Sequence, residues 1–200
     1  MLYKIGITGG IGSGKTKVCT VFEALGVPVY YSDMQAKKLM NTDPKLKADI
    51  SECFGNDIYR DGTLDTKKMA GMVFNSKTEL KKLNSLVHPA VARDFENWRL
   101  QQNAYYVLQE AAIIFESNIA SRFDRVILVT APEELRIWRV CQRDNVTPED
   151  VKKRMKNQLP EETKIMLADY IIQNDNKRFI VPQVIELHYE LLDILTSQSG

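Results

Sequence analysis

The chain has 200 residues, of which 44% are hydrophobic and 26% charged, a balance typical of a globular fold with a sizeable core. Its formal net charge of +1 provides no overall field for nucleic acid or an anionic membrane, so we expect neither as a partner. No apolar run reaches membrane-spanning length, and the three cysteines lack metal-ligand spacing; free thiols in a cytoplasmic protein are the expectation.

The first predicted elements are a buried strand over residues 2–8, a glycine-rich loop, and a helix over residues 16–25. The loop reads Gly9-Gly10-Ile11-Gly12-Ser13-Gly14-Lys15-Thr16 and fits the phosphate-binding pattern, in which Gly is followed by four residues and then Gly-Lys-Thr. A glycine turn that merely precedes a lysine is the alternative. The full pattern between a strand and a helix disfavours that alternative.

Each part of this loop has a chemical reason. Glycines let the backbone approach phosphate oxygens closely, so that successive N–H groups and the helix start can bind an anion. Lys15 supplies a mobile positive charge for the terminal phosphates, and Thr16 offers a hydroxyl to Mg²⁺. We therefore predict that residues 9–16 bind a nucleotide and its metal ion.

A second short strand is predicted over residues 27–31, with Pro28 at its beginning. It brings Asp33 to the carboxyl edge of the sheet, where ligands bind in open parallel sheets. Asp33 has two compatible interpretations: the N-cap of a helix over residues 34–40, and a functional acid on the same edge as the phosphate loop.

Residues 41–102 change in character, because polar residues dominate and the apolar ones fall at helical spacing. We predict a helix over residues 44–54, a turn at residues 60–62, and further helical clusters from residue 69 to residue 100. His88-Pro89 is expected to break the last of these helices. The stretch is far longer than a simple crossover needs, which indicates an inserted helical subdomain that clamps the substrate.

The remaining strands are predicted over residues 105–110, 124–130 and 168–174, and a final helix opens at Pro182. The first of these strands ends in Glu110. An acid in that position of a phosphate-loop enzyme often orients the metal or its waters, so Glu110 is a candidate metal-site residue. An ordinary strand-end carboxylate is the alternative.

Two short helices, one opening at Pro132 and the other after Pro148, carry Arg136, Arg139, Arg143 and Arg154. Arginine's planar fork suits phosphate oxygens, and a hinged pair of helices can bring it in when substrate is present. We predict a lid with at least one catalytic arginine. Solvated helix faces with ordinary ion pairs are the alternative.

These features together resemble dephospho-coenzyme A kinase nearly from end to end. The loop alone is shared by many enzymes, whereas the combination of inserted helices, His88-Pro89 and the lid is much more specific. The matching residues are Ile7 to Thr16, Asp33, Phe54-Gly55, Asp61-Gly62, Phe74, Leu83-Asn84, His88-Pro89, Phe115-Glu116, Arg139, Arg143, Arg154, Gln158, Ala168-Asp169 and Asn174.

The resemblance implies transfer of the ATP γ-phosphoryl group to the ribose 3′-hydroxyl of dephospho-coenzyme A, the last step of coenzyme A synthesis, with ATP and Mg²⁺ as cofactors. Asp33 matches the family's proposed acid–base residue and joins Lys15 and Arg143 as catalytic candidates. Beside the loop, ATP binding is assigned to Arg139 and Asn174. Substrate binding is assigned to Asp33, His88, Arg93, Glu116 and Arg154.

The expected fold is an α/β phosphate-loop NTPase of three layers with a five-stranded parallel sheet, a helical substrate-binding insertion and a short helical lid. The nucleotide-binding core is assigned to residues 1–40, 103–138 and 159–200, the insertion to residues 41–102, and the lid to residues 139–158.

Two other functions are less well supported. A nucleoside monophosphate or shikimate kinase would share the chemistry, but its acceptor-binding segment is organised differently from the insert that contains His88-Pro89. A guanine-nucleotide switch would carry Asn-Lys-x-Asp, whereas Asn174-Asp175-Asn176-Lys177 has the wrong order.

Overall fold

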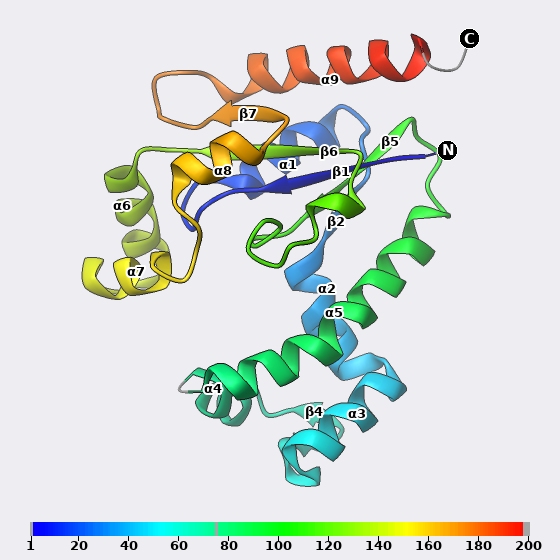
Figure 1. Cartoon of the computed structure of the whole chain (residues 1–200), viewed down its shortest axis with the longest axis vertical. Helices are drawn as coiled ribbons and strands as arrows, with labels where there is room; N and C mark the ends of the chain where they lie inside the picture. Colours follow the sequence, from blue (N-terminus) through cyan, green and yellow to red (C-terminus); the bar gives the residue numbers. More distant parts are fainter. Residues whose placement is uncertain (1, 75, 198–200) are drawn as a thin grey trace. The chain divides into compact units, whose positions relative to one another are not determined.

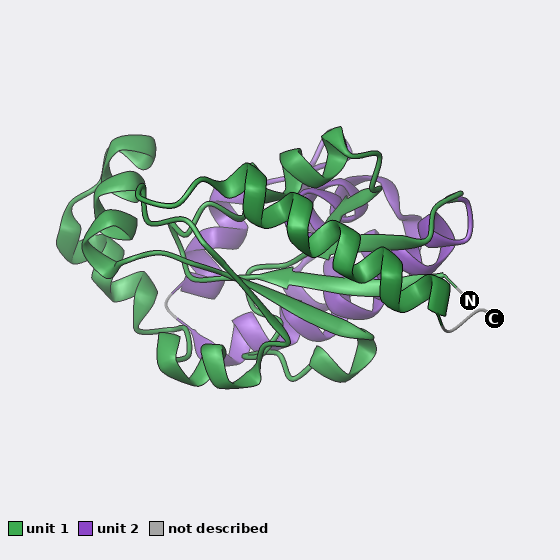
Figure 2. Cartoon of the chain, turned by 90° about the horizontal axis from the view of Figure 1, so that it is seen from above, with its two compact units in different colours: residues 1–31, 102–200 green, residues 32–101 purple. Residues whose placement is uncertain are grey.

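A computed structural model describes residues 2–74 and 76–197. Two compact units make up the chain (Figure 2): unit 1 contains Met1–Tyr31 and Gln102–Gly200, and unit 2 contains Ser32–Gln101. None of the helices in the described ranges combines the length and the apolar character needed to cross a membrane.

Unit 1 is built on the predicted five-stranded parallel sheet (Figure 1). The strands are β1 (Tyr3–Thr8), β2 (Val29–Tyr31), β5 (Tyr106–Glu110), β6 (Arg125–Thr130) and β7 (Tyr170–Gln173), in the order β2-β5-β1-β6-β7. Their short apolar runs suit a sheet that is covered on both faces. In the register, Ile7 of β1 pairs with Glu110 of β5, so the phosphate loop and the end of β5 leave the same edge of the sheet.

Helices and loops cover both faces of this sheet. On one face, Phe22 of α1 (Lys15–Ala24) and Leu191 of α9 (Ile180–Ser197) pack with Ile127 of β6. On the other face, Val126 of β6 packs with Ile114 and its neighbours. Adjacent strand residues point to opposite faces, so Val126 and Ile127 lie in separate clusters. The helix α8 (Glu161–Leu167) is an element that the sequence pattern did not predict.

The two predicted short helices are α6 (Glu133–Asp144) and α7 (Pro148–Met155). Asn145, directly after α6, has the left-handed backbone conformation. Thr147 caps α7 by accepting a hydrogen bond from the Asp150 backbone N–H. Pro148 at the first position of α7 also favours a helix start, because its fixed φ angle suits a helix.

Unit 2 is the predicted helical insertion together with the helix before it. It contains α2 (Ser32–Thr42), α3 (Pro44–Phe54), α4 (Thr66–Phe74) and α5 (Lys77–Arg99). A small hairpin of β3 (Tyr59–Arg60) and β4 (Thr63–Leu64) surrounds the predicted turn. The helix α5 packs against α2, α3 and α4.

Two expectations for unit 2 were wrong. First, Pro89 does not break the helix: α5 runs without interruption from Lys77 to Arg99. Proline removes one backbone hydrogen bond at a cost of about 3 kcal/mol. Burial of Val87, Ala90, Val91 and Phe95 on the packed side of α5 offsets that cost, and Pro89 itself is exposed.

Second, Asp33 is not the N-cap of the following helix, because α2 already begins at Ser32 and places Asp33 in its first turn. An acidic side chain in the first turn still interacts favourably with the helix dipole. The side chain of Asp33 is exposed, and the residue lies two positions after the end of β2 at Tyr31.

Candidate nucleotide site

The phosphate loop lies between β1 and α1, with Gly14 as the residue that precedes the helix. Gly12 and Gly14 have φ angles of 79° and 91°, in the left-handed region that favours glycine. A Cβ atom at Gly12 would lie 2.4 Å from the carbonyl oxygen of Arg136, and one at Gly14 would lie 2.1 Å from Asn174 Nδ2. Both positions therefore require glycine for conformation and for space.

Lys15 lies against the loop. Its ammonium donates a 3.1 Å hydrogen bond to the carbonyl oxygen of Gly9 and lies 3.9 Å from Oε1 of Glu110. Both side chains are largely buried, with 12% and 10% of their surface exposed, so their charges are weakly screened by solvent. The structure thus brings together two residues that the sequence placed in the site separately.

The residues suited to a magnesium ion are Thr16 and Glu110. Thr16 is exposed in the first turn of α1, and Glu110 ends β5 beside Lys15. In the described ranges, no group of three or more His, Cys, Asp or Glu side chains could hold a metal ion. Mg²⁺ is commonly held by one or two protein oxygens plus substrate phosphates and water, and a hydroxyl and a carboxylate are oxygen ligands of that kind.

Arg139 and Asn174 both form hydrogen bonds with the phosphate loop. The buried amide of Asn174 donates a 2.7 Å hydrogen bond to the carbonyl oxygen of Ser13. The Arg139 guanidinium donates to the Asn174 carbonyl oxygen at 3.0 Å and to Asn176 Oδ1 at 2.7 Å. Burial lowers the pKa of Arg139 from its usual range. The two predicted ATP-binding residues outside the loop are thus in direct contact with each other and with it.

Arg143 and Arg154 both bind Asp144. Arg143 donates to the two carboxylate oxygens at 2.7 and 3.1 Å, and Arg154 donates to Oδ2 at 3.1 Å. The hydrogen bonds from Arg143 hold the pKa of Asp144 below its usual range. A phosphate group would compete with Asp144 for these two guanidinium groups, which are 64% and 46% exposed.

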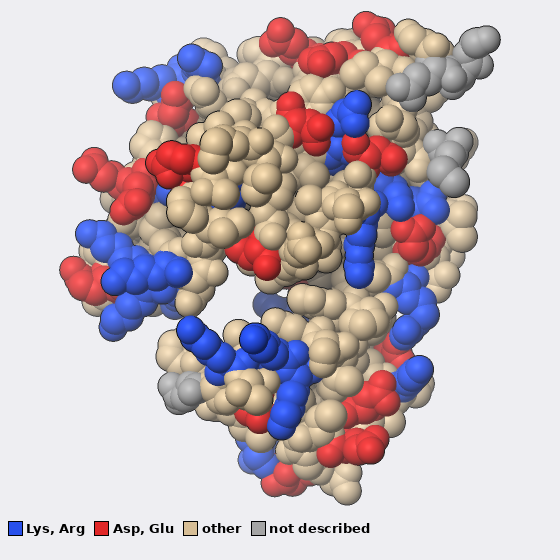
Figure 3. Space-filling model, viewed as in Figure 1, with Lys and Arg blue, Asp and Glu red and all other residues tan. Residues whose placement is uncertain are grey.

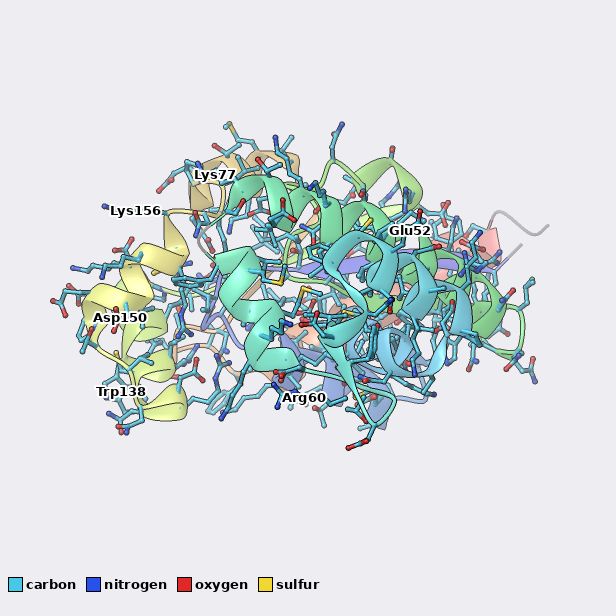
Figure 4. The ribbon with its side chains drawn as sticks, turned by 90° about the horizontal axis from the view of Figure 1, so that it is seen from below. Glu52, Arg60, Lys77, Trp138, Asp150 and Lys156 are labelled. Carbon is cyan, nitrogen blue, oxygen red and sulfur yellow. The ribbon has the colours of Figure 1, made fainter. Side chains whose placement is uncertain are left out.

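Basic side chains also gather on the outside of α7 (Figure 3), where its last turn carries Lys152, Lys153 and Arg154. In Figure 4, Trp138 of α6 and Asp150 of α7 lie at the outer edge of these helices. Trp138 is 59% exposed.

The end of the predicted lid is tied to the loop through Gln158, which the sequence-based site assignment left out. Gln158 Oε1 accepts a 2.9 Å hydrogen bond from the backbone N–H of Ile11. The next residue, Leu159, donates its backbone N–H to Glu116 Oε1 at 3.0 Å. Glu116 Oε2 is buried and has no hydrogen-bond partner among the described residues. Glu116, which is expected to bind substrate, therefore also holds the chain at the end of the predicted lid.

Three more of the expected substrate residues, Asp33, His88 and Arg93, lie in unit 2. Arg93 of α5 donates a 2.9 Å hydrogen bond to Asp43, whose side chain also caps α3 by accepting from the backbone N–H groups of Lys45 and Leu46. Hydrogen bonds from those N–H groups and from Arg93 lower the pKa of Asp43. His88 is exposed on α5, before Pro89.

Comparison with known proteins identifies relatives across most of the chain. The sequence model of a family described as dephospho-CoA kinase matches residues 3–179. A dephospho-CoA kinase of Bacteroides fragilis is 37% identical over 188 residues, which cover 94% of this chain and 92% of that protein.

Solved structures agree with these matches. A crystal structure from Thermus thermophilus has a TM-score of 0.83 at 30% identity and covers 94% of this chain and 97% of its own. A dephospho-CoA kinase from Campylobacter jejuni has a TM-score of 0.69 at 25% identity and covers 96% and 98%.

Proposed function

The chain belongs to the dephospho-coenzyme A kinase family, and on that premise we propose that it transfers the γ-phosphoryl group of ATP to the ribose 3′-hydroxyl of dephospho-coenzyme A. The products are coenzyme A and ADP, and the reaction is the last step of coenzyme A synthesis. The observation that carries this proposal is the family match over residues 3–179, which includes the phosphate loop and the inserted helices.

The nucleotide is held at the phosphate loop. Backbone N–H groups of the loop would bind the β- and γ-phosphates, apart from those of Ile11 and Ser13, which donate to Gln158 and Gly10, and Lys15 adds a full charge. Arg139 and Asn174 support the loop from behind and bind the nucleotide beside it. Thr16 and Glu110 would hold Mg²⁺ with the phosphates, where the ion neutralises charge on the transferred group.

Asp33 is the residue we assign to the acceptor. Its carboxylate would accept or orient the proton of the attacking 3′-hydroxyl, a general-base contribution of roughly 10²- to 10⁴-fold. Its position two residues after β2 supports this role, because that strand ends at the edge of the parallel sheet where ligands bind in such folds. His88, Arg93, Glu116 and Arg154 are assigned to substrate binding.

The lid at residues 139–158 supplies charge to the reacting phosphoryl group. Little covalent work falls to the protein in phosphoryl transfer, so positioning and charge stabilisation carry most of the rate. Arg143 is the candidate, because its side chain is 64% exposed and, among the described residues, is held by the neighbouring Asp144 alone. If phosphate oxygens replaced the Asp144 carboxylate, the Arg143 guanidinium would be paired with an anion both before and after the phosphates bind.

We place this activity in the cytoplasm. Cys19, Cys53 and Cys141 are free cysteines, which supports a reducing compartment.

The activity is tested by ADP release and by the mass of the product. Purified protein is incubated with ATP and Mg²⁺, and dephospho-coenzyme A, adenosine, AMP and shikimate are offered in parallel. The proposal requires release that only dephospho-coenzyme A stimulates, with a product heavier by one phosphoryl group. Stimulation by AMP or shikimate instead would favour another small-molecule kinase, and slow hydrolysis without any phosphorylated acceptor would favour a nucleotide switch.

A further inference from the structure

Three charged side chains of unit 1 form a buried cluster that the reaction described above does not use. Arg136 comes from the first turn of α6, and Glu161 and Lys164 come from α8. Glu161 Oε2 lies 3.5 Å from Arg136 Nη1 and 3.5 Å from Lys164 Nζ. The exposed fractions of the Arg136, Glu161 and Lys164 side chains are 8%, 17% and 2%.

The charges in this cluster do not balance. Two cations share one carboxylate, which leaves a formal charge of +1 in a buried place. Arg136 Nε and Glu161 Oε1 are also buried without a hydrogen-bond partner among the described residues. A buried cation without full compensation is costly, so a site that retains one is expected to face an anion when it works.

The cluster packs against the phosphate loop. A Cβ atom at Gly10 would lie 2.1 Å from Arg136 Nη1 and 3.4 Å from Glu161 Oε2, so both charged groups pack against the bare Cα of Gly10. The backbone carbonyl of Arg136 approaches Gly12 in the same way. Arg136 thus contacts the phosphate loop at two glycines, with its guanidinium at Gly10 and its backbone at Gly12.

We propose that Arg136, together with Glu161 and Lys164, places a buried positive charge behind the phosphate loop and thereby favours nucleotides with more highly charged phosphate chains. Arg136 is a positioning residue: it acts on the phosphates through the loop and not by direct contact. The proposal rests on the assignment of nucleotide binding to this loop, but it does not depend on which acceptor is phosphorylated.

The physical reason is the low dielectric of the site. A buried charge acts on a nearby anion with little screening by water or salt, whereas the exposed lysines of α7 are screened within about 10 Å at moderate ionic strength. The attraction grows with the charge of the ligand. It therefore strengthens binding in the order AMP, ADP, ATP when no metal is present to neutralise the phosphates.

The experiment measures dissociation constants of ATP, ADP and AMP by calorimetry in EDTA, without any acceptor, at low and high salt. We expect Arg136→Gln to weaken ATP binding by about tenfold or more, ADP binding less, and AMP binding least, at both salt concentrations. Arg136→Lys keeps the charge and should restore most of the loss. Arg122→Gln, at an exposed arginine of the same unit, is the matched control and should leave all three constants unchanged.

Glu161→Gln provides an independent test with the opposite sign. It removes the carboxylate, raises the formal charge of the cluster to +2, and should tighten ATP binding more than AMP binding. If Arg136→Gln fails to fold, Glu161→Gln and Arg136→Lys still decide the question. An equal loss for the three nucleotides in Arg136→Gln, a loss shared by Arg136→Lys, or weaker ATP binding in Glu161→Gln would assign the cluster to bracing α6 against α8 and overturn the proposal.

The result of this binding experiment does not depend on the result of the acceptor assay. Charge-dependent nucleotide binding in a protein that does not phosphorylate dephospho-coenzyme A would keep this inference and remove the proposed acceptor. Phosphorylation of dephospho-coenzyme A, with nucleotide binding in the variants that does not depend on phosphate charge, would keep the proposed acceptor and remove this inference.

Discussion

The backbone N–H of Ile11 and the side chain of Gln158 are joined by a 2.9 Å hydrogen bond that links the phosphate loop to the end of the predicted lid. The adjacent residue is fixed as well, because Leu159 donates to Glu116. Two successive residues thus tie the chain just after α7 to other parts of unit 1. We predict that the Gln158 amide couples the phosphate loop to the predicted lid.

Gln158→Ala should disturb this coupling without unfolding the protein. A lost hydrogen bond of this type is worth about 0.5–1.5 kcal/mol, so we expect kcat/KM for ATP to fall by roughly two- to tenfold. Steady-state kinetics at varied ATP measures the change. Gln142→Ala removes an exposed amide from α6 and is the control; an equal fall in that variant would remove Gln158 from the coupling.

Gly14→Ala should destroy nucleotide binding and lower the free energy of unfolding. The φ angle of 91° and the 2.1 Å approach to Asn174 leave no room for a methyl group, and the expected loss of stability exceeds about 1 kcal/mol. Urea unfolding and ATP titration measure the two effects.

Gly71→Ala is the matched control, because a Cβ atom at this position in α4 meets nothing within 4 Å. Alanine there should raise the free energy of unfolding by about 0.5–1 kcal/mol through its better helix propensity. If Gly14→Ala were as stable and as active as Gly71→Ala, the loop geometry described here would be wrong.

Asp33→Asn tests the proposed general base. The side chain is exposed, so the substitution should leave the unfolding midpoint nearly unchanged while turnover with dephospho-coenzyme A falls by roughly 10²- to 10⁴-fold. ATP binding, measured by titration, should stay close to that of the unaltered protein. Unchanged turnover would remove Asp33 from the chemistry.

The elements that the sequence predicted correctly are those whose pattern is local. The loop and the five strands follow from short apolar runs and glycines, and the turn between α6 and α7 follows from Asn145 to Pro148. The path of α5 through Pro89 was missed, since the packing of Val87 and Val91 that overrides proline lies outside the local pattern.

The contacts of Gln158 and Arg136 are seen only in the structure, because they join segments that are distant in the sequence. Gln158 reaches Ile11 across 147 positions, and Arg136 meets Glu161 from a helix that the pattern did not predict. In the sequence, Arg136 is only weakly indicated as a site residue, as one of three arginines on the same predicted helix. Its burial, which separates it from Arg143, depends on the packing of α8.

Arg143→Ala should lower kcat strongly and change ATP binding only modestly, because the guanidinium is assigned to the transferred phosphoryl group. At least a tenfold loss of kcat is expected for a charge that acts in the transition state. Lys153→Ala removes an exposed cation from α7 and serves as the control. A loss confined to ATP affinity would make Arg143 a nucleotide anchor instead.

His188 should make stability depend on pH. Burial lowers its pKa, and its Nδ1 lies 2.6 Å from the Tyr106 hydroxyl. A folded-state pKa below the unfolded value means that the unfolded chain binds the proton more readily. The stabilising contribution is therefore complete above about pH 6.5 and is lost as the pH falls below that value.

Urea unfolding at pH 7.5 and pH 5.5 measures this effect. The free energy of unfolding should fall on acidification, and His188→Gln should reduce the fall. A pH dependence that is unchanged in His188→Gln would place the responsible group elsewhere in the chain.

The central claim is the identity of the acceptor, and parallel ADP-release assays with dephospho-coenzyme A, adenosine, AMP and shikimate test it most directly. We predict that only dephospho-coenzyme A stimulates release and that its mass increases by one phosphoryl group at the ribose 3′ position. Phosphorylation of a different acceptor, or ATP hydrolysis without a phosphorylated product, would contradict the proposed function.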